Sequence, residues 1–332
     1  MEPVKRLPYP ILLVALLALN LFVFLLHIGL GQFTITPWEV AASLIGAGNA
    51  EHDFIVHTLR LPRAVLGFMT GAGLAVSGAL LQGFTRNPLA SPGVLGLNAG
   101  AAAAAVLVIV AFTDVPIAWL PFAAFAGAVL VAACSYVLAW RDGMSSIRLV
   151  LIGIGIAAVC QALITILLTY GQIRSVSQAT IWMTGSLYGK GWEHFTPYWP
   201  WFVASMLLAF TLTRQLDVLA LGDELAGGLG IRLELKRFLI ILASVGLAAS
   251  SVAVVGTVSF VGLMAPHLAR SFTGVSHARL LPAAALVGGL IVLAADLLGR
   301  TLLAPTEIPC GLLTAIIGGP YFLYLLRRQK AS

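Results

Sequence analysis

Long apolar runs dominate the chain, and within them apolar and polar residues do not alternate. The first run, residues 10–30, reaches the roughly 20 apolar residues that a helix needs to cross a hydrocarbon core about 30 Å thick. Strands of a membrane barrel would alternate in polarity over about ten positions, whereas these runs are apolar on every side. The pattern therefore predicts transmembrane α-helices, which satisfy their backbone groups internally.

Breaks between the apolar runs predict about ten spans. They cover residues 10–30, 62–82, 94–112, 117–139, 148–169, 196–213, 237–256, 257–272, 280–298 and 310–326. The seventh and eighth are separated only by a turn near Gly256, and the C-terminus would change sides if they formed one bent span. We expect an all-α polytopic membrane protein in which residues 1–332 form a single transmembrane domain.

Composition supports this prediction, because 60% of the residues are hydrophobic and only 10% are charged. Lys5 and Arg6 precede the first run as they would in a signal peptide, but its apolar core is too long, so we expect a retained helix. Cys134, Cys160 and Cys310 show no pairing or metal-ligand spacing and are expected to be buried free thiols.

Lysine and arginine indicate the orientation of the chain in the membrane. With a cytoplasmic N-terminus and ten crossings, 14 of the 19 basic residues lie inside. The five on the outer side are Arg60, Arg63, Arg174, Lys190 and Arg300. This skew favours an even number of spans with both termini in the cytoplasm. It also explains the net charge of +6 without nucleic-acid binding.

The sequence contains no P-loop for ATP. The nearest string, "GSLYGKG" (185–191), has the wrong spacing and lies on the predicted outer side of the membrane.

Asp296 is the one acid placed well inside a predicted span, and such residues are rarely without a role. It lies four residues before Arg300, so a local ion pair is expected. A proton-coupled secondary transporter that uses Asp296 as its carrier remains the alternative.

The longest inner loop, residues 214–237, predicts a short amphipathic helix. Asp223 would be its N-cap, Leu225 and Leu229 would face one side, and Gly230 would end it. The helix is either an ordinary interfacial connector or a docking surface for a soluble partner. The glycines of the spans, such as the pair Gly67 and Gly71, indicate close helix packing.

Six stretches occur in this order: "RLPR" (60–63), "GAGLAVSGALLQGFTRNPLASPGVLGLNAGA", "ALGDELAGGLGI", "GTVSFVGLMAPHLAR", "LLPAAALVGGLIVLAADLLGR" and "EIPCGLLTAIIGGPYFLYLL". On them the chain resembles the FecCD family of ABC-importer permeases, over about residues 57–326. The resemblance implies a type II ABC importer permease fold of ten helices with an inverted repeat, in which the second to fifth spans run opposite to the seventh to tenth.

The resemblance also implies the partners. The family imports ferric siderophores, haem or cobalamin across the bacterial inner membrane. Its permease pairs with an identical or paralogous second permease, receives cargo from a periplasmic binding protein and is driven by two cytoplasmic ATPase subunits. These subunits hold ATP and Mg, so we expect no cofactor, metal or covalent chemistry on this chain. All three cargo classes stay open, with a ferric siderophore first as the family's commonest substrate.

Site residues follow from the same resemblance. Arg60, Arg63 and Arg300 match rim arginines that meet acidic side chains of the binding protein, for which bidentate guanidinium groups are suited. Their alternative role is to anchor helix ends. The contact with the ATPase would involve Asp223, Glu224, Ala226, Gly227, Leu229 and Gly230.

Two inner turns match the family's cytoplasmic gate. One is "RNPLASP" (86–92), which nominates Asn87 and Leu89, although its Asn-Pro and Ser-Pro dipeptides also form ordinary turns. The other contains Ser145 and Ser146. His267, in "PHLAR", is expected to be structural.

Overall fold

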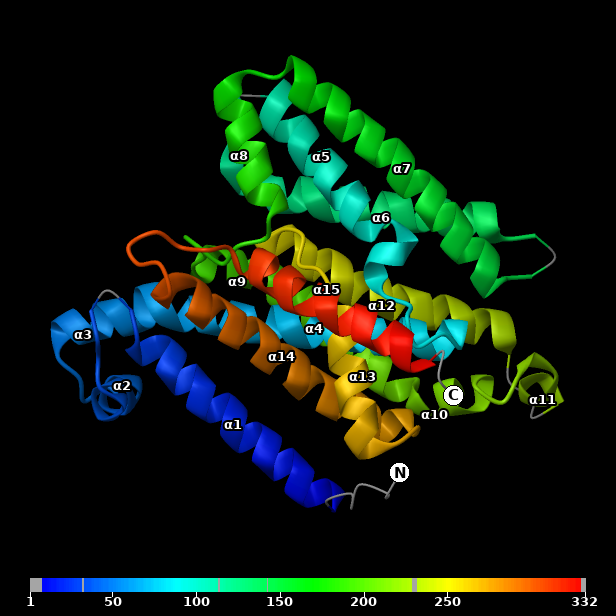
Figure 1. Ribbon diagram of the computed structural model, residues 1–332, viewed down its shortest axis with the longest axis horizontal. Coiled ribbons are helices and arrows are strands. Elements are labelled where there is room, and N and C mark those ends of the chain that lie inside the picture. The colour runs from blue at the N-terminus through cyan, green and yellow to red at the C-terminus, as the bar shows by residue number, and fades with distance from the viewer. Residues whose placement is uncertain (1–7, 32, 113, 142, 229–231, 330–332) are drawn as a thin grey trace.

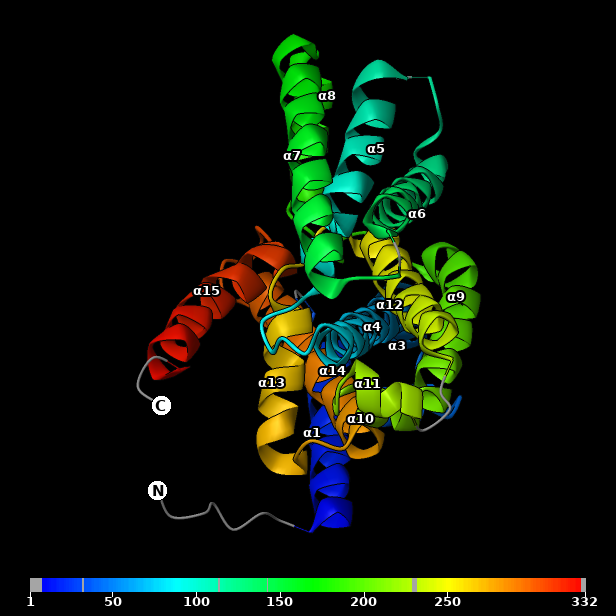
Figure 2. The same ribbon diagram turned by 90° about the vertical axis from the view of Figure 1, so that its right-hand side faces the viewer.

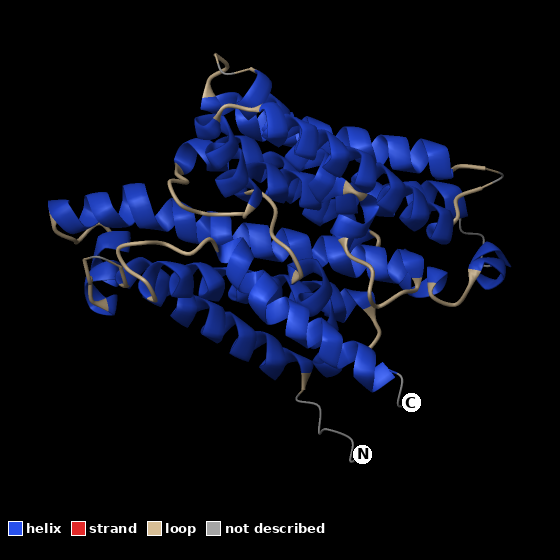
Figure 3. Ribbon diagram, turned by 45° about the horizontal axis from the view of Figure 1, so that its top comes forward, coloured by secondary structure: helices blue, strands red, loops and turns tan. Residues whose placement is uncertain are grey.

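The computed structural model describes residues 8–31, 33–112, 114–141, 143–228 and 232–329, and it is almost entirely helical (Figures 1 and 3). A helix coincides with each of the ten predicted spans: α1 (Tyr9–Gly29), α4 (Leu61–Thr85), α5 (Leu97–Ala111), α6 (Leu120–Ala139), α7 (Ser146–Tyr170), α9 (Trp192–Thr211), α12 (Leu233–Val255), α13 (Val261–Thr273), α14 (His277–Thr301) and α15 (Cys310–Gln329). The all-α prediction is confirmed.

Shorter helices lie outside the predicted spans. At the end of the bundle predicted to face outward these are α2 (Pro37–Leu44), α3 (Ala50–Phe54) and α8 (Ile173–Met183), and a π-helical turn, Ile55–Arg60, leads from α3 into α4. On the inner side, α10 (Thr213–Leu219) and α11 (Asp223–Gly228) form the long loop. Two 3-10 turns, Pro92–Leu95 and Ile117–Trp119, precede α5 and α6.

Length separates the helices into two groups. Within the described ranges, six are long and apolar enough to cross a membrane, and α9 joins α10 across a 52° bend to make a seventh. By contrast, α5, α13 and the apolar part of α15 (Cys310–Leu325) are shorter. The 13 residues of α13 span only about 20 Å at 1.5 Å per residue. The shorter helices therefore rely on neighbouring segments to complete their passage.

Helix α4 forms the centre of the bundle, with α14 lying along it and α12 and α13 beside it (Figures 1 and 2). Glycines permit this close packing. A Cβ at Gly71 would lie 2.1 Å from the carbonyl oxygen of Gly288, and a Cβ at Gly78 would lie 1.7 Å from that of Gly262. The close packing predicted from the span glycines is confirmed for Gly71, which touches the backbone of α14.

Helices α5, α6, α7 and α8 form a second group that packs on α12 and stands apart from α1 and α14 (Figure 2). Helices α5, α6 and α7 are apolar around much of their circumference. This explains why one prediction failed: Cys310 is buried, but Cys160 is only partly buried and Cys134, on α6, is exposed. An apolar helix does not reveal from its sequence which face points inward.

Two irregular connections occupy matching places in the chain. One leads from α4 to α5 and the other, residues 256–260, leads from α12 to α13. The predicted turn at Gly256 is confirmed, with φ of +84°. Helix α13 begins at Val261 and not at residue 257 as predicted, because residues 256–260 form no helix and Phe260 has a left-handed backbone with φ of +66°. Ser91, Pro92 and Gly93 face Ser259 and Phe260 across a hollow of about 200 Å³.

Candidate functional site

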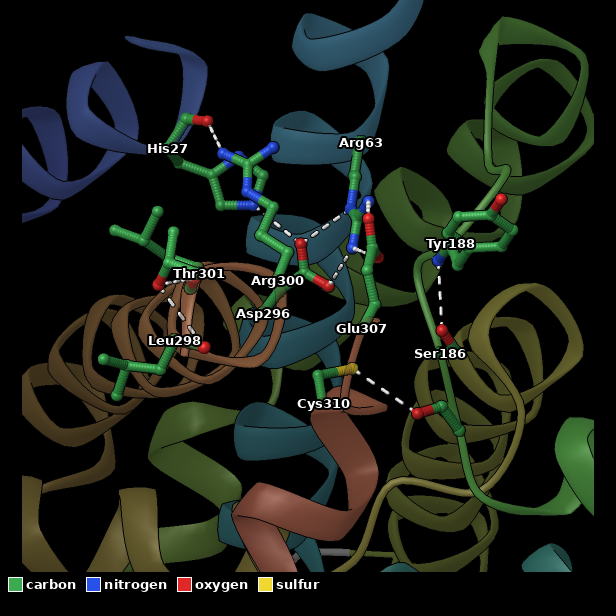
Figure 4. A network of polar contacts seen from close by, with 12 residues as sticks. His27, Arg63, Ser186, Tyr188, Asp296, Leu298, Arg300, Thr301, Glu307 and Cys310 are labelled. Carbon is green, nitrogen blue, oxygen red and sulfur yellow. Dashed lines mark hydrogen bonds and ion pairs between the residues drawn. The ribbon is translucent and has the colours of Figure 1, made fainter. Parts of the chain in front are cut away.

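The three predicted rim arginines come together at one end of the bundle, the end predicted to face outward. Figure 4 shows two of them, Arg63 and Arg300. Here α1 ends, α4 begins and α14 ends. Arg60, Arg63 and Arg300 line one hollow of about 360 Å³ together with Glu307 and Tyr188. The "RLPR" motif and the end of α14 are more than 200 residues apart in sequence, so the fold creates this cluster. We call these five residues the outer cluster.

Arg60 and Arg300 hold the end of α1. Arg60 donates to the carbonyl oxygens of Ile28 at 2.6 Å, Gly29 at 2.9 Å and Phe33 at 2.5 Å. Arg300 donates to the carbonyl oxygen of His27. The last carbonyls of a helix lack partners inside it and carry partial negative charge, so cations stabilise them. Both arginines, 7% and 9% exposed, therefore act as a C-terminal cap for α1.

Arg63 makes a different set of contacts. Its Nε and Nη2 donate to the two carboxylate oxygens of Asp296 at 2.7 and 2.9 Å. Its Nη2 and Nη1 donate to Glu307 at 2.7 and 3.3 Å. On each of two edges of the guanidinium group, one carboxylate thus accepts two hydrogen bonds. The single ammonium group of a lysine could not reproduce this geometry.

The predicted ion pair between Asp296 and Arg300 is wrong. Asp296, 2% exposed, pairs with Arg63 and accepts a hydrogen bond from His27 Nε2 at 2.8 Å. Spacing of four residues does place Asp296 and Arg300 on one face of α14. Helix α1 packs over that face, however, and its terminal carbonyls take Arg300. A buried carboxylate needs such partners because desolvation of an unpaired charge is costly.

A second polar cluster lies at the opposite, inner end of the bundle. Asp223, at the start of α11, accepts from Arg86 at 2.8 Å and from Arg237 at 2.8 Å. Arg237 also donates to Glu234 at 3.0 Å and to the carbonyl oxygen of Met144 at 3.1 Å. Glu234 in turn accepts from the backbone N–H of Met144 at 3.3 Å. We call Arg86, Met144, Asp223, Glu234 and Arg237 the inner network.

The inner network connects three segments that are far apart in the sequence: the turn that begins at Arg86, the turn that contains Met144, and α11 with the start of α12. Arg86 opens the turn that contains Asn87 and Leu89, and Met144 directly precedes Ser145 and Ser146. Helix α11 is thus linked to both turns nominated as the cytoplasmic gate: to one by the ion pair of Asp223 with Arg86, and to the other through Arg237, which pairs with Asp223 and donates to Met144. The gate residues themselves make local contacts: the side chain of Asn87 accepts from the N–H of Leu89 at 2.9 Å, and Ser146 begins α7.

The short helix predicted in the loop 214–237 is present as α11, with differences at both ends. Asp223 is its first residue and bonds to arginines where a capping role was predicted. Glu224, Gly227 and Leu225 are exposed, whereas Ala226 is buried. The predicted contacts Leu229 and Gly230 lie outside the described residues. The exposed side of α11 thus begins with two carboxylates.

Several residues of these clusters are not predicted by the sequence. His27 lies inside the first apolar run, and an ionisable residue at such a place is itself a signal. Glu307, Glu234 and Arg237 gave no signal, because loop charges are common. His267 stacks edge-on against Tyr321 at 6.0 Å between ring centroids, consistent with the structural role expected for it. Among the described residues, no three His, Cys, Asp or Glu side chains converge to hold a metal ion.

The helical bundle defines the class of protein. It superposes on a structure described as an inward-facing conformation of a metal-chelate type ABC transporter, with a TM-score of 0.87 and 29% sequence identity over 96% of this chain and 99% of the other. The protein is therefore a polytopic transport permease. It belongs to the FecCD transport family, which matches residues 17–328. The family predicted from the sequence is confirmed.

Named relatives agree with this assignment. A probable siderophore transport system permease protein of Bacillus subtilis is 43% identical over 97% of this chain and 96% of its own. An Fe(3+)-citrate import system permease protein of the same organism is 45% identical over 96% and 95% of the two chains. An Fe(3+) dicitrate transport system permease protein of Escherichia coli is 40% identical over 92% and 95%.

Proposed function

We propose that this chain is the permease subunit of an ABC importer that carries a ferric siderophore, or a similar ferric chelate, across the bacterial inner membrane. The similarity to permeases named for siderophore and ferric citrate transport supports a ferric chelate over haem or cobalamin. Two partner ATPases would hold ATP and Mg and perform the hydrolysis. A second permease, identical or paralogous, would complete the pathway.

The observation that carries this proposal is the placement of two polar clusters at opposite ends of an apolar bundle. The outer cluster presents arginines where a periplasmic binding protein with acidic side chains would dock. The inner network presents α11 where an ATPase would bind. Such interfaces suit a protein that transmits motion between two soluble partners, because it needs differential contacts at two distinct sites.

The inner network suggests how the two turns could respond to the ATPase. Asp223 and Glu224 lie on α11. Asp223 pairs with Arg86, next to the turn with Asn87 and Leu89. It also pairs with Arg237, which donates to the carbonyl oxygen of Met144, next to Ser145 and Ser146. A displacement of α11 would therefore pull on both turns. We assign Asn87, Leu89, Ser145 and Ser146 to the cytoplasmic gate and Asp223, Glu224, Ala226, Gly227, Leu229 and Gly230 to the ATPase contact.

Affinity purification from the native membrane tests the proposal. A tagged copy of the chain is solubilised in detergent, and the proteins that accompany it are identified by mass spectrometry. We expect an ATPase with a P-loop, with or without a second permease. The complex should hydrolyse ATP, whereas the permease alone should not.

Transport by the isolated chain would contradict the proposal. Proteoliposomes that contain only this permease are given a pH gradient and a labelled ferric chelate, and we expect no uptake. Uptake abolished by Asp296→Asn would instead identify a proton-coupled transporter. The structure gives that alternative little support, because both oxygens of Asp296 are already engaged by Arg63 and His27.

A further inference from the structure

The donors of Arg63 are almost fully used inside this chain. Arginine carries five N–H groups. Asp296 accepts two and Glu307 accepts two, which leaves one N–H on Nη1. A carboxylate arriving from outside therefore cannot bind Arg63 in a bidentate manner unless one of the present partners leaves.

The two partners differ in how firmly they are held. Asp296 is 2% exposed, projects from α14 and also holds His27 on α1. Its departure would separate a buried carboxylate from an arginine that is only 11% exposed, at high cost. Glu307 is 26% exposed and lies between α14 and α15, in a segment whose Leu302 and Leu303 are exposed. Glu307 is the partner that can be displaced.

Arg60 and Arg300 offer no equivalent site for an incoming carboxylate. Arg60 and Arg300 already donate to the terminal carbonyls of α1, and these contacts would be lost if either turned outward. Glu307 and the three arginines line the same hollow of about 360 Å³. Figure 4 shows Glu307 against Arg63, with Arg300 nearby. The carboxylate site on the solvent-facing edge of Arg63 is thus already built, and Glu307 occupies it.

We propose that Glu307 is an internal substitute for a carboxylate of the binding protein, and that docking displaces it from Arg63. This inference rests on the proposed function. An acidic side chain of the binding protein would exchange with Glu307 on the same edge of the guanidinium group, and the segment 302–309 would be released as the exchange takes place. Glu307 therefore competes with docking.

The sign of the effect separates this role from a structural one. If Glu307 competes, Glu307→Gln should tighten docking; if it merely shapes the rim, the same change should weaken docking or leave it unchanged. We expect a gain in affinity of about three- to fivefold, the range of a partly exposed ion pair. Glu307→Ala, which removes the hydrogen-bonding group entirely, should give a gain in the same direction.

The measurement uses the complete transporter in nanodiscs and the purified, cargo-free binding protein of the same transporter, titrated in low salt. Glu193→Gln is the matched control. It removes an equal charge from the outer side, but Glu193 is exposed and contacts His194, not an arginine. The affinity of the Glu193→Gln transporter for the binding protein should equal that of the unmodified transporter.

A second readout follows the released segment directly. Amide hydrogen exchange of residues 302–309 should rise when the binding protein docks to the unmodified transporter. In Glu307→Gln it should already be raised before docking. An unmodified transporter that binds no periplasmic protein would overturn the proposed function together with this inference. Normal docking with an affinity for Glu307→Gln no higher than for Glu193→Gln would overturn this inference alone.

Discussion

At the scale of single residues, the role of each arginine in the outer cluster depends on the groups that it contacts. Three arginines that look alike in sequence perform two tasks. Arg60 and Arg300 cap the end of α1, and Arg63 holds two carboxylates. The docking role remains a prediction for all three, and the anchoring alternative describes Arg60 and Arg300 in this structure.

Asp296→Asn should destabilise the protein. The amide keeps the shape of the side chain but leaves Arg63 and His27 without their buried anion, and breaking a buried pair costs about 3 kcal/mol or more. Glu307 still holds Arg63, which limits the loss. The unfolding midpoint in detergent measures it. The control Glu224→Gln, at an exposed carboxylate, should leave the midpoint unchanged. Equal midpoints for the two variants would show that the Asp296 pair contributes nothing to stability.

At the scale of elements, glycines decide how closely the helices approach. Helices α4, α13 and α14 meet backbone to backbone, which side chains of any size would prevent. Small residues at such crossings permit close van der Waals packing in membrane helices, where no hydrophobic driving force separates protein from lipid. The positions of α13 and its irregular connection depend on this contact.

Gly78→Ala should force α4 and α13 apart, because the added methyl group meets the backbone of Gly262 and not a movable side chain. Overpacking of this kind costs about 1–3 kcal/mol. Gly155→Ala on α7 is the control, since a Cβ there meets nothing within 4 Å. Thermal unfolding of the two variants in the same detergent makes the comparison. A Gly78→Ala protein as stable as the control would mean that α13 can shift without loss.

A second prediction at this scale concerns the inner network. Arg237→Gln removes one of the two ion pairs of Asp223 and weakens the link to Met144. In the complete transporter, ATP hydrolysis should continue while cargo uptake per ATP falls by about fivefold or more, the range of a typical coupling energy. Arg232→Gln, at an exposed arginine five residues earlier, should keep normal uptake. An unchanged ratio of uptake to hydrolysis in Arg237→Gln would exclude this link from coupling.

At the scale of the whole molecule, the polar contacts gather at two ends of the bundle, and the orientation derived from charge stays a prediction. Two arginines assigned to the outer side, Arg60 and Arg300, donate to carbonyl oxygens at the end of α1. Two assigned to the inner side, Arg86 and Arg237, pair with Asp223 on α11. The two sets lie at opposite ends of the bundle, as the inner and outer surfaces of a membrane protein require.

The rate at which an amine reagent labels Lys190, and its dependence on pH, test this orientation. It lies in the outer segment between α8 and α9, where burial lowers its pKa to about 8. The neutral amine, which is the reactive form, is therefore present well below the ordinary lysine pKa of about 10.4. A membrane-impermeant amine reagent applied to right-side-out vesicles should label Lys190, with half-maximal rate near pH 8.

Lys236 is the control for the same experiment, since it lies at the inner start of α12. Peptide mapping should find it unlabelled until the membrane is permeabilised. Labelling of Lys236 from outside, with Lys190 protected, would reverse the topology. A rate for Lys190 that keeps rising towards pH 10 would show that its ammonium group is fully solvated.

The sequence by itself determined the helical class, the approximate positions of ten spans, the expected orientation and the family. These properties follow from local hydropathy, from the basic residues of short loops and from motifs that are continuous in the chain. Tertiary structure alone decided which charges meet. Spacing placed Asp296 beside Arg300, but α1 and α4, distant in sequence, supplied its real partners. The tertiary structure likewise decided that Arg60 and Arg300 bind the end of α1, that Cys134 is exposed, and that α11 contacts the two inner turns. Such pairings depend on which helices pack together and on which face, and a helical pattern read along one segment contains no information about its neighbour.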